Sequence, residues 1–281
     1  MSTSAHDTHL AHGTHDTTLA TLALLALLTP LPLPRQVGFV ARLPPGLRAV
    51  EPIELILLMG AMTAGVLVWA AASTVSRQKA ALRELWPCYG VDVGWNETMA
   101  PAGLFDSAGP CVLDVGFGHG DSLVGMAAKR PDARFLGVEV HRPGVAAALM
   151  RLAEADTANV KICRIDAIAL LESHIPPEPA FDEVCVFFPD PFFKANSVHR
   201  RIVRPHTLDL LAARLRPGGC LHVATDVDEY AEHVRGVLAA DSRWRAADVD
   251  GRPAWRPETM YERRGVSRGH TITDLSFVLA A

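Results

Sequence analysis

The sequence lacks an excess of positive charge, and its cysteines are not paired. The formal net charge of its 281 residues is -4, which excludes a protein that is a polycation as a whole, so any surface for nucleic acid must be local. None of the five cysteines is spaced C-x-x-C, and four fall in predicted strands, where cysteine behaves as a small buried hydrophobe. This pattern suits a reducing compartment, and we expect a cytoplasmic protein.

The first 75 residues lack the basic start of a secretory signal. Asp7 and Asp16 precede the apolar run 18–28, and that run is too short to span a bilayer comfortably. Histidines recur at every third position from His6 to His15. We interpret them as part of a polar tail rather than as a metal site, and we expect no metal in the protein.

A second apolar stretch, from Leu55 to Ser73, has nineteen residues and no charge. Its length makes it a candidate membrane span, although glycine and alanine dilute its centre. We favour a buried or loosely attached helix over contact with a membrane. A third alternative is that this part is not the native reading frame, since the composition changes abruptly near Ser73. The expected organisation is therefore an atypical extension over 1–75 and a folded domain over 76–281.

Three glycines on alternate positions, Gly116, Gly118 and Gly120, follow the apolar run 111–115 and precede a helical pattern. Glycine allows a tight turn and lets a ligand approach without a Cβ in the way. The next predicted strand ends in Glu139, where a carboxylate can accept hydrogen bonds from both hydroxyls of a ribose. The spacing G-x-G-x-G differs from the G-x-G-x-x-G of dinucleotide folds and favours a methyltransferase that binds S-adenosyl-L-methionine over a dehydrogenase.

Predicted strands and helices alternate from Cys111 onward, which is typical of a parallel sheet with helices on both faces. The expected strands are 111–115, 135–139, 160–164, 183–188, 220–224, about 244–249 and 273–279. The expected helices are 76–86 with Ser76 as N-cap, 119–130, 143–156, 166–174, 198–215 and 228–240. These seven strands predict an α/β, Rossmann-like class I methyltransferase fold with a mostly parallel sheet. Ligands of such sheets bind at the carboxyl ends of the strands.

Two further acids lie in or just after predicted strands, Asp114 inside the first of them, two residues before Gly116. Asp114 is either a cap of the glycine turn or a ligand for the amino group of a methionine moiety, and we favour the second interpretation. Asp166 follows the strand 160–164, where it can accept a hydrogen bond from an adenine amino group, cap the next helix, or do both.

The segment Pro189-Asp190-Pro191 ends an apolar strand. The two prolines fix the loop and project the carboxylate of Asp190 over the edge of the sheet. Methyltransferases that act on planar nitrogen groups often carry an acid between prolines in this way, so the segment resembles one that carries a catalytic acid. The alternative is a rigid turn without a chemical role.

Basic residues follow this loop and recur before the last predicted strand. The first cluster is Lys194, His199, Arg200, Arg201, Arg204, Arg214 and Arg216. The second is Arg252, Arg256, Arg263, Arg264 and Arg268. Two local clusters in an otherwise acidic chain suggest phosphate binding around the site, and the alternative for each is an ordinary solvated face.

Taken together, these motifs resemble the bacterial tRNA (guanine-N7-)-methyltransferases, from about Ser76 to the end of the chain. The matching stretches are 113–120, 135–141 with Pro143-Gly144, 187–191 with Lys194, 199–203, 224–232 and 256–265. The chain departs from the family pattern with Asp114 in place of a glutamate, with Phe192-Phe193 in place of Trp-His, and with an apolar stretch where a basic one is usual.

The resemblance implies transfer of a methyl group from S-adenosyl-L-methionine to N7 of a guanine in the variable loop of tRNA, by a monomer or homodimer. It implies cofactor contacts at Asp114, Gly116, Gly118, Gly120, Glu139, Asp166 and Asp190, with Asp190 also catalytic. It implies substrate contacts at Lys194, Asp226, Thr259, Met260, Tyr261 and Glu262. Two rivals are a methyltransferase with a small-molecule or protein amide substrate, and a membrane-anchored binding protein with an inactive domain.

Overall fold

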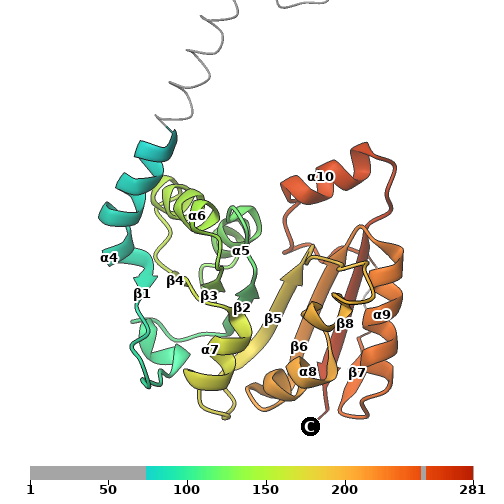
Figure 1. Cartoon of the computed structure of the whole chain (residues 1–281). Helices are drawn as coiled ribbons and strands as arrows, with labels where there is room; N and C mark the ends of the chain where they lie inside the picture. The colour runs from blue at the N-terminus through green and yellow to red at the C-terminus, as the bar shows by residue number, and fades with distance from the viewer. Residues whose placement is uncertain (1–73, 248–250, 281) are drawn as a thin grey trace, which may run out of the picture. The chain divides into compact units, whose positions relative to one another are not determined.

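The computed structural model describes residues 74–247 and 251–280 (Figure 1). Our predictions for the histidine-rich start, the apolar stretch and the N-terminal extension fall outside these residues. Contacts between residues group Val75–Ala281 into one unit, and only this unit is described below. The division at residue 75 stays a prediction. No helix in the described ranges combines the length and the apolar composition that a bilayer span requires.

Within the described residues, eight strands form one sheet in the order β1-β4-β3-β2-β5-β6-β8-β7. Their bounds are β1 Gly90–Val91, β2 Cys111–Val115, β3 Arg134–Val138, β4 Val160–Cys163, β5 Phe181–Phe187, β6 Leu215–Thr225, β7 Trp244–Ala246 and β8 Thr273–Leu279. Pairing is parallel from β1 to β6, whereas β8 runs antiparallel to β6 and to β7. The predicted Rossmann-like fold is confirmed. Strand β1 is additional, because two residues are too few to show a pattern in the sequence.

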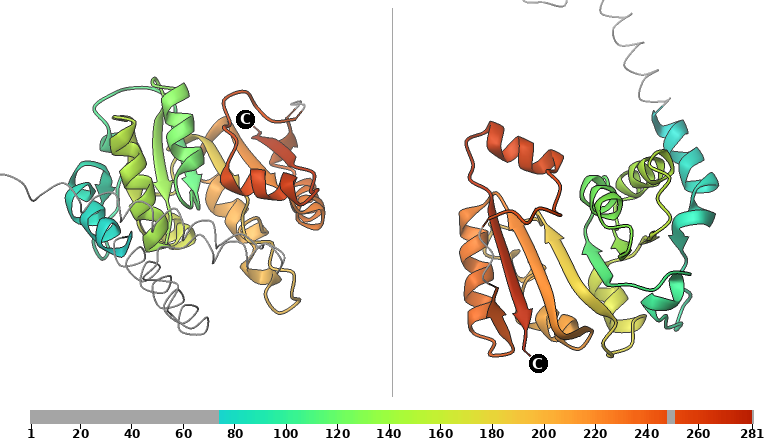
Figure 2. Two further views of the ribbon diagram at one scale, coloured as in Figure 1. Left: turned by 90° about the horizontal axis from the view of Figure 1, so that it is seen from above. Right: turned by 180° about the vertical axis from the view of Figure 1, so that it is seen from behind.

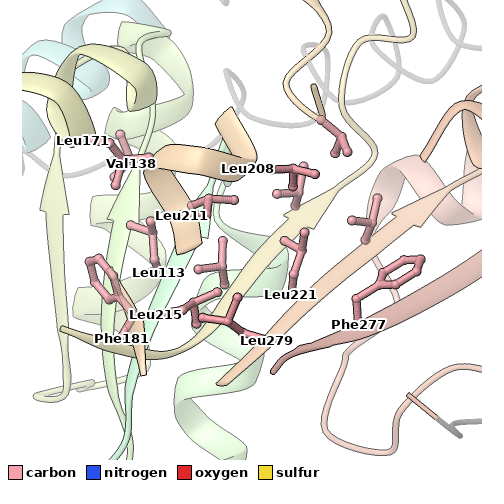
Figure 3. Close-up of a cluster of buried hydrophobic side chains, with 14 of the residues drawn as sticks. Leu113, Val138, Leu171, Phe181, Leu208, Leu211, Leu215, Leu221, Phe277 and Leu279 are labelled. Carbon is pink, nitrogen blue, oxygen red and sulfur yellow. The ribbon is translucent and has the colours of Figure 1, made fainter. Parts of the chain in front are cut away.

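Helices cover both faces of the sheet (Figure 1, Figure 2). The main helices are α5 Asp121–Lys129, α6 Arg142–Glu154, α7 Ala167–Ser173, α8 Pro205–Ala212 and α9 Asp228–Ala239. Side chains of α7, α8 and α9 pack on one face with Leu113 and Val138, as Figure 3 shows for Leu171, Leu208 and Leu211. Side chains of α5 and α6 pack on the other face with Val112 and Phe135. The alternation of Val112 and Leu113 between the two cores is the period of two expected of a strand buried on both sides.

The helix predicted at 198–215 is wrong. The chain forms a short 3-10 turn at Val198–Arg200, helix α8, and then the first residues of β6. Pro205 forces the preceding Arg204 into an extended conformation, with φ -155° and ψ 161°, so no helix continues through this point. Leu215 pairs with Phe181 of β5, which takes it into the sheet.

The N-terminal helix also differs from the prediction. Residues 74–84 are helical, so Ser76 lies inside the helix and is not its N-cap. A second short helix, α4, covers Trp86–Tyr89 with Pro87 in its first turn, where proline is tolerated. Pro87 therefore opens a helix rather than ending one.

Helix α10, Met260–Ser267, lies in a segment where we predicted no helix. Its N-cap is Thr259, whose hydroxyl accepts a hydrogen bond from the Glu262 N–H at 3.1 Å. The pattern Thr-x-x-Glu is a recognised start signal for helices and could have revealed it. In Figure 1 this helix lies beyond the carboxyl end of β5, at the edge of the sheet where the parallel strands end.

Candidate active site

A pocket of about 410 Å³ opens at the carboxyl ends of β2, β3 and β5. Seven of the predicted site residues line it: Gly116, Gly118, Glu139, Asp166, Asp190, Thr259 and Tyr261. The other predicted residues, Asp114, Gly120, Lys194, Asp226, Met260 and Glu262, are not among its lining residues. The structure thus brings together three carboxylates, two glycines and part of the α10 segment. Their assignment to cofactor or substrate stays a prediction.

The three glycines have different tasks in the structure. Gly116 and Gly118 adopt φ values of 72° and 60° and border the pocket, in a conformation that favours glycine. Gly120 also has a positive φ, but a Cβ there would lie 2.7 Å from the Cβ of Ala148 on α6. Its small size therefore permits close packing of two helices, which is the task of the third glycine in dinucleotide folds.

Glu139 is fixed at the pocket by three backbone N–H groups. Its Oε2 accepts from Gly118 at 2.9 Å, and its Oε1 accepts from Val140 and His141, both at 2.8 Å. A carboxylate offers about four acceptor sites, so acceptor capacity remains on Oε2 for a ligand hydroxyl. The same hydrogen bonds tie the glycine loop to the end of β3. Glu139 therefore shapes the pocket as well as lining it.

Replacement of Glu139 by glutamine is expected to weaken cofactor binding by about tenfold or more, since hydrogen bonds to a charged acceptor contribute about 1.5–3 kcal/mol each. Calorimetry with S-adenosylmethionine measures the effect. Glutamine keeps one oxygen to accept from the backbone, whereas Glu139→Ala also frees the Gly118 N–H and should lower the melting temperature. Wild-type affinity in the folded glutamine variant would contradict this assignment.

Asp114 is buried in β2 and faces α5, where its Oδ2 accepts a hydrogen bond from the Ser122 hydroxyl at 3.3 Å. Burial raises the pKa of this carboxyl to about 7, the Ser122 hydrogen bond opposes that change, and the charge of Glu139 adds to it. A raised pKa means that the folded state binds a proton more tightly than the unfolded state. This residue therefore contributes less stability as pH rises from about 4 to about 7. A cationic ligand group nearby would favour the ionised form.

Asp166 caps helix α7. Its Oδ1 accepts from the N–H groups of Ile168 and Ala169, both at 3.0 Å. No hydrogen bond to its Oδ2 is found among the described residues, and Asp166 lines the pocket. The cap fixes the side chain and leaves one oxygen for a ligand, so the two alternatives from the sequence are compatible.

The loop that carries Asp190 has a strained backbone and is held by a hydrogen bond from Arg201. Phe188 and Phe192, on either side of Pro-Asp-Pro, have φ values of 51° and 43°, which are uncommon for bulky residues and often occur at functional sites. Asp190 itself is exposed at the pocket and forms no hydrogen bond or ion pair with the described residues. Arg201 donates from Nε to the Pro191 carbonyl at 2.7 Å. The loop thus presents a free carboxylate in a fixed position.

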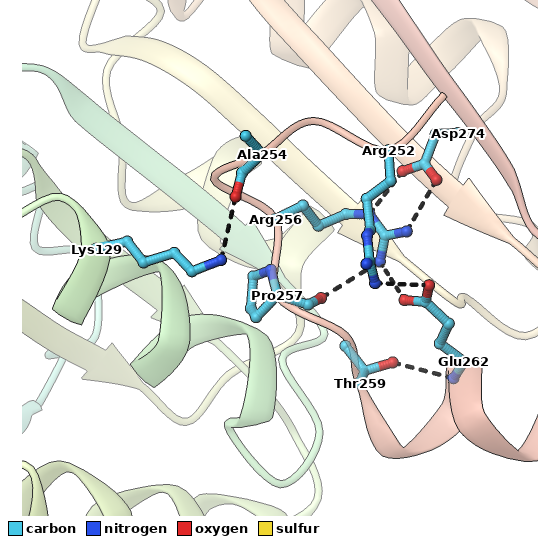
Figure 4. Close-up of polar contacts among 8 residues, drawn as sticks. All are labelled: Lys129, Arg252, Ala254, Arg256, Pro257, Thr259, Glu262 and Asp274. Atoms are coloured by element: carbon cyan, nitrogen blue, oxygen red, sulfur yellow. Dashed lines mark hydrogen bonds and ion pairs between the residues drawn. The ribbon is translucent and has the colours of Figure 1, made fainter. Parts of the chain in front are cut away.

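The members of the two basic clusters differ in their exposure and in their partners. Arg201 is 4% exposed and pairs with Glu229, which makes it a support of the loop rather than a phosphate ligand. Several other members are also bound within the fold: Arg204 donates to the His199 carbonyl, Arg214 to the Ile175 carbonyl, Arg216 to Asp182, and Arg252 and Arg256 to Glu262 (Figure 4). The side chains of Lys194, Arg263, Arg264 and Arg268 are exposed and form no such bond with described residues. These four remain available to phosphates.

Three predicted substrate residues are engaged inside the protein. Asp226 follows β6. Its Oδ2 lies 2.9 Å from Nδ1 of His270, within hydrogen-bond and ion-pair distance, and its side chain packs against Gly265 of α10. Glu262 is buried between Arg252 and Arg256. Thr259 uses its hydroxyl as the cap of α10. Tyr261, in contrast, is exposed, lines the pocket and lies next to Gly118.

His119 is a pocket residue that sequence reasoning missed. It lies between Gly118 and Gly120, and its Nδ1 is buried without a hydrogen-bond partner among the described residues. A histidine inside a glycine-rich turn gives no distinctive signal in one sequence. Among the described residues there is no group of three or more His, Cys, Asp or Glu that could hold a metal ion.

Comparison with known proteins shows the family of this chain. Residues 108–275 match a family described as putative methyltransferase. The tRNA (guanine-N(7)-)-methyltransferase of Halorhodospira halophila is 46% identical over 207 residues, which are 72% of this chain and 89% of that protein. The chain belongs to the tRNA (guanine-N(7)-)-methyltransferase family. The enzyme of the same name from Burkholderia lata is 41% identical and is matched over 82% of its length, by 75% of this chain.

Membership of the tRNA (guanine-N(7)-)-methyltransferase family makes the protein a methyltransferase, and its cofactor is S-adenosylmethionine. The residues present fit that cofactor. Glu139 and Asp166 keep free acceptor capacity, His119 keeps an unpartnered ring nitrogen, and the glycine loop leaves open space at Gly116. The family relationship extends through the α10 segment, whose Tyr261 closes one side of the pocket.

Proposed function

We propose that this protein methylates N7 of a guanine in the variable loop of tRNA, using S-adenosyl-L-methionine, in the cytoplasm. The observation that supports this best is the carboxylate of Asp190, which has no partner among the described residues and lies on a strained loop at the pocket that also contains Glu139 and the glycine turn. The exposed arginines of α10 lie on the same helix as Tyr261, which lines this pocket.

The chemistry requires positioning and charge stabilisation rather than a base. When bound, S-adenosylmethionine supplies a methyl group on a positively charged sulfur. Guanine N7 has a free lone pair, so no proton is removed from it. Positive charge builds up on the purine during transfer. The carboxylate of Asp190, placed against the N1–H and amino edge of the guanine, would stabilise that charge and orient the base. Asp226 is the weaker candidate because His270 already occupies its Oδ2.

The remaining pocket residues have binding tasks in this proposal. Glu139 accepts from the ribose hydroxyls, and the free oxygen of Asp166 accepts from the adenine amino group. The backbone at Gly116 and Gly118 gives the cofactor close access to the end of β2. The target guanine must leave its stack to enter the pocket. The aromatic ring of Phe192, over which Arg200 lies at 4.6 Å, is a surface on which such a base can rest.

The direct test is an assay with S-adenosylmethionine labelled at the methyl group. Unmodified tRNA transcripts are incubated with the enzyme, digested to nucleosides and analysed for 7-methylguanosine. The matched control is a transcript in which the variable-loop guanine is replaced by adenine. We expect label in 7-methylguanosine from the first transcript alone. Label in a different nucleoside, or transfer only to protein or small-molecule acceptors, would contradict the proposed function.

Salt dependence tests the RNA surface separately. Arg264→Ala is expected to weaken tRNA binding and to lower the slope of log affinity against log salt by roughly 0.7–0.9, the effect of releasing one phosphate. The matched control is Arg245→Ala, which removes another exposed arginine, on the edge strand β7 of the sheet. Filter binding from low to high salt measures both slopes. Equal slopes in the two variants would make Arg264 an ordinary solvated residue.

A further inference from the structure

A second cavity, of about 440 Å³, lies beside the candidate active site, and the two share Ile165 in their walls. We infer that this second cavity, lined by Trp86, Asp92, Arg142 and Arg164 among others, binds a phosphate group of the RNA backbone. The inference deepens the proposed function and rests on it. It places part of the tRNA on the β1 side of the sheet, away from the α10 arginines.

The lining of this cavity carries a net positive charge. Arg142 is the first residue of α6 and Arg164 directly follows β4. Both arginines are exposed, and neither forms a hydrogen bond or an ion pair with any described residue. Asp92 is the one acid among the described lining residues. In a chain of net charge -4, two free guanidinium groups on one cavity stand out as a local anion site.

The lone acid of this cavity holds a wall residue in place. The carboxylate of Asp92 accepts a hydrogen bond from the Trp86 indole N–H at 3.0 Å. The indole also lies against Gly90, where a Cβ would come within 2.1 Å of the ring. These two contacts hold Trp86 in place, so this part of the cavity wall is already formed. Asp92 thereby serves as a structural acceptor. It forms no ion pair with Arg142 or Arg164 among the described residues, and the two arginines outnumber it, so the lining has a net positive charge.

An exposed tryptophan next to the cavity favours RNA over a small anion. Residues 94–97 form a turn in which the Glu97 N–H donates to the Gly94 carbonyl at 3.2 Å. The turn presents Trp95, whose side chain is 91% exposed. Trp95 follows Asp92 by three residues, so their Cα atoms lie at most about 11 Å apart. A cationic groove with an adjacent aromatic surface is the arrangement that binds an unpaired nucleotide, by phosphate contact and base stacking together.

The position of the cavity agrees with this partner. Strand β1 pairs in parallel with β4, so Asp92 and Arg164 lie at the same carboxyl edge of the sheet as Asp190. An RNA that inserts a base into the first pocket must pass along this edge. Contacts on both sides of the pocket would then hold the RNA across the edge, with Arg142 and Arg164 on one side and Arg264 on the other.

The test uses the full chain and compares Arg142→Ala, Arg164→Ala, the double variant and Trp95→Ala with the control Arg245→Ala. For the double variant we expect tRNA affinity at least about tenfold lower and a salt slope smaller by roughly 0.7–0.9 for each phosphate that is no longer bound. Trp95→Ala should lower affinity at an unchanged salt slope, because stacking releases no counterions. The KM for tRNA should rise in these variants, while kcat at saturating tRNA and calorimetric affinity for S-adenosylmethionine stay at the wild-type values.

The outcomes separate this inference from the proposed function. Formation of 7-methylguanosine by the wild type reports on the proposed function alone. If it forms, and the double variant matches Arg245→Ala in affinity and slope, the second cavity is not an RNA site. Binding of inorganic phosphate or AMP that is abolished in the double variant, with tRNA binding unaffected, would also overturn the inference in favour of a small anion. Melting temperatures within the range of the control show that the exposed arginines were removed without unfolding the protein.

Discussion

Replacement of Asp190 by asparagine or alanine is expected to lower kcat for methyl transfer to tRNA by about 10²–10³, the usual effect of removing one preorganised group that stabilises transition-state charge. Asparagine keeps the size of the side chain and its ability to accept one hydrogen bond, but it has no negative charge. The asparagine variant therefore isolates the electrostatic contribution to transfer. The strained φ values at Phe188 and Phe192 and the Arg201 contact should persist, since none of them involves the Asp190 side chain.

Single-turnover kinetics with tRNA saturating and calorimetry with the cofactor separate transfer from binding. The tRNA affinity of the Asp190 variants should keep its full salt slope, because the phosphate contacts are unchanged. Asp132→Asn is a matched control, since Asp132 is an exposed acid before β3, at the opposite end of the sheet. If Asp190→Asn transfers at a rate within about twofold of wild type while Asp226→Asn does not, Asp226 is the acid that stabilises the purine charge and the role proposed for Asp190 is wrong.

The parts of this site that the sequence predicted are those determined by local patterns. Strand β2 is a short apolar run, glycines follow it at alternate positions, and Glu139 directly follows strand β3. A parallel sheet brings such strand ends to one edge, so Glu139, Asp166 and Asp190 were expected at one pocket and lie there. The proline residues around Asp190 likewise predict a fixed loop from sequence alone.

The parts that the sequence did not reveal depend on partners far away in the chain. Arg201 and Arg264 are both arginines in basic runs, yet the first is buried against Glu229 and the second is exposed. No spacing rule distinguishes them, because Glu229 comes to Arg201 through the packing of α9. Gly120 shows the same limit: its neighbour Ala148 lies on another helix, so its packing task is visible only in three dimensions.

The second large effect concerns the segment that carries α10, and it arises from Arg256. This guanidinium is 2% exposed and donates to both oxygens of Asp274 on β8, at 2.6 and 2.8 Å, and to Glu262 of α10 at 2.6 Å (Figure 4). Burial alone lowers the pKa of Arg256, but the hydrogen bonds to Asp274 and Glu262 outweigh it and the pKa is raised. The rings of Phe187 and Phe188 lie within 5.9 Å of its guanidinium carbon. One side chain therefore joins β8, α10 and the loop of Asp190.

Arg256→Ala is expected to lower the free energy of unfolding by about 3–5 kcal/mol, because Asp274 would remain nearly buried without its counter-ion and Glu262 would keep only the partly exposed Arg252. Arg252→Ala is the matched control: its side chain is 45% exposed and, among the described residues, its one ion pair is with Glu262 at 3.1 Å, so about 1 kcal/mol or less is expected. Urea unfolding measures both values. A loss below about 1 kcal/mol for Arg256→Ala would show that the carboxylates find water or other partners.

A compensating variant tests whether the loss comes from the stranded charges. Arg256→Met combined with Asp274→Asn and Glu262→Gln removes the three charges together and fills the space, so it should recover much of the stability that Arg256→Ala removes. Function should not recover with it. Glu262 would no longer be drawn by an ion pair toward β8, so α10 would hold Tyr261 less firmly over Gly118. We therefore expect the compensated variant to be folded but to bind S-adenosylmethionine more weakly than wild type. Wild-type affinity in that variant would mean that α10 keeps its place without the Arg256 network.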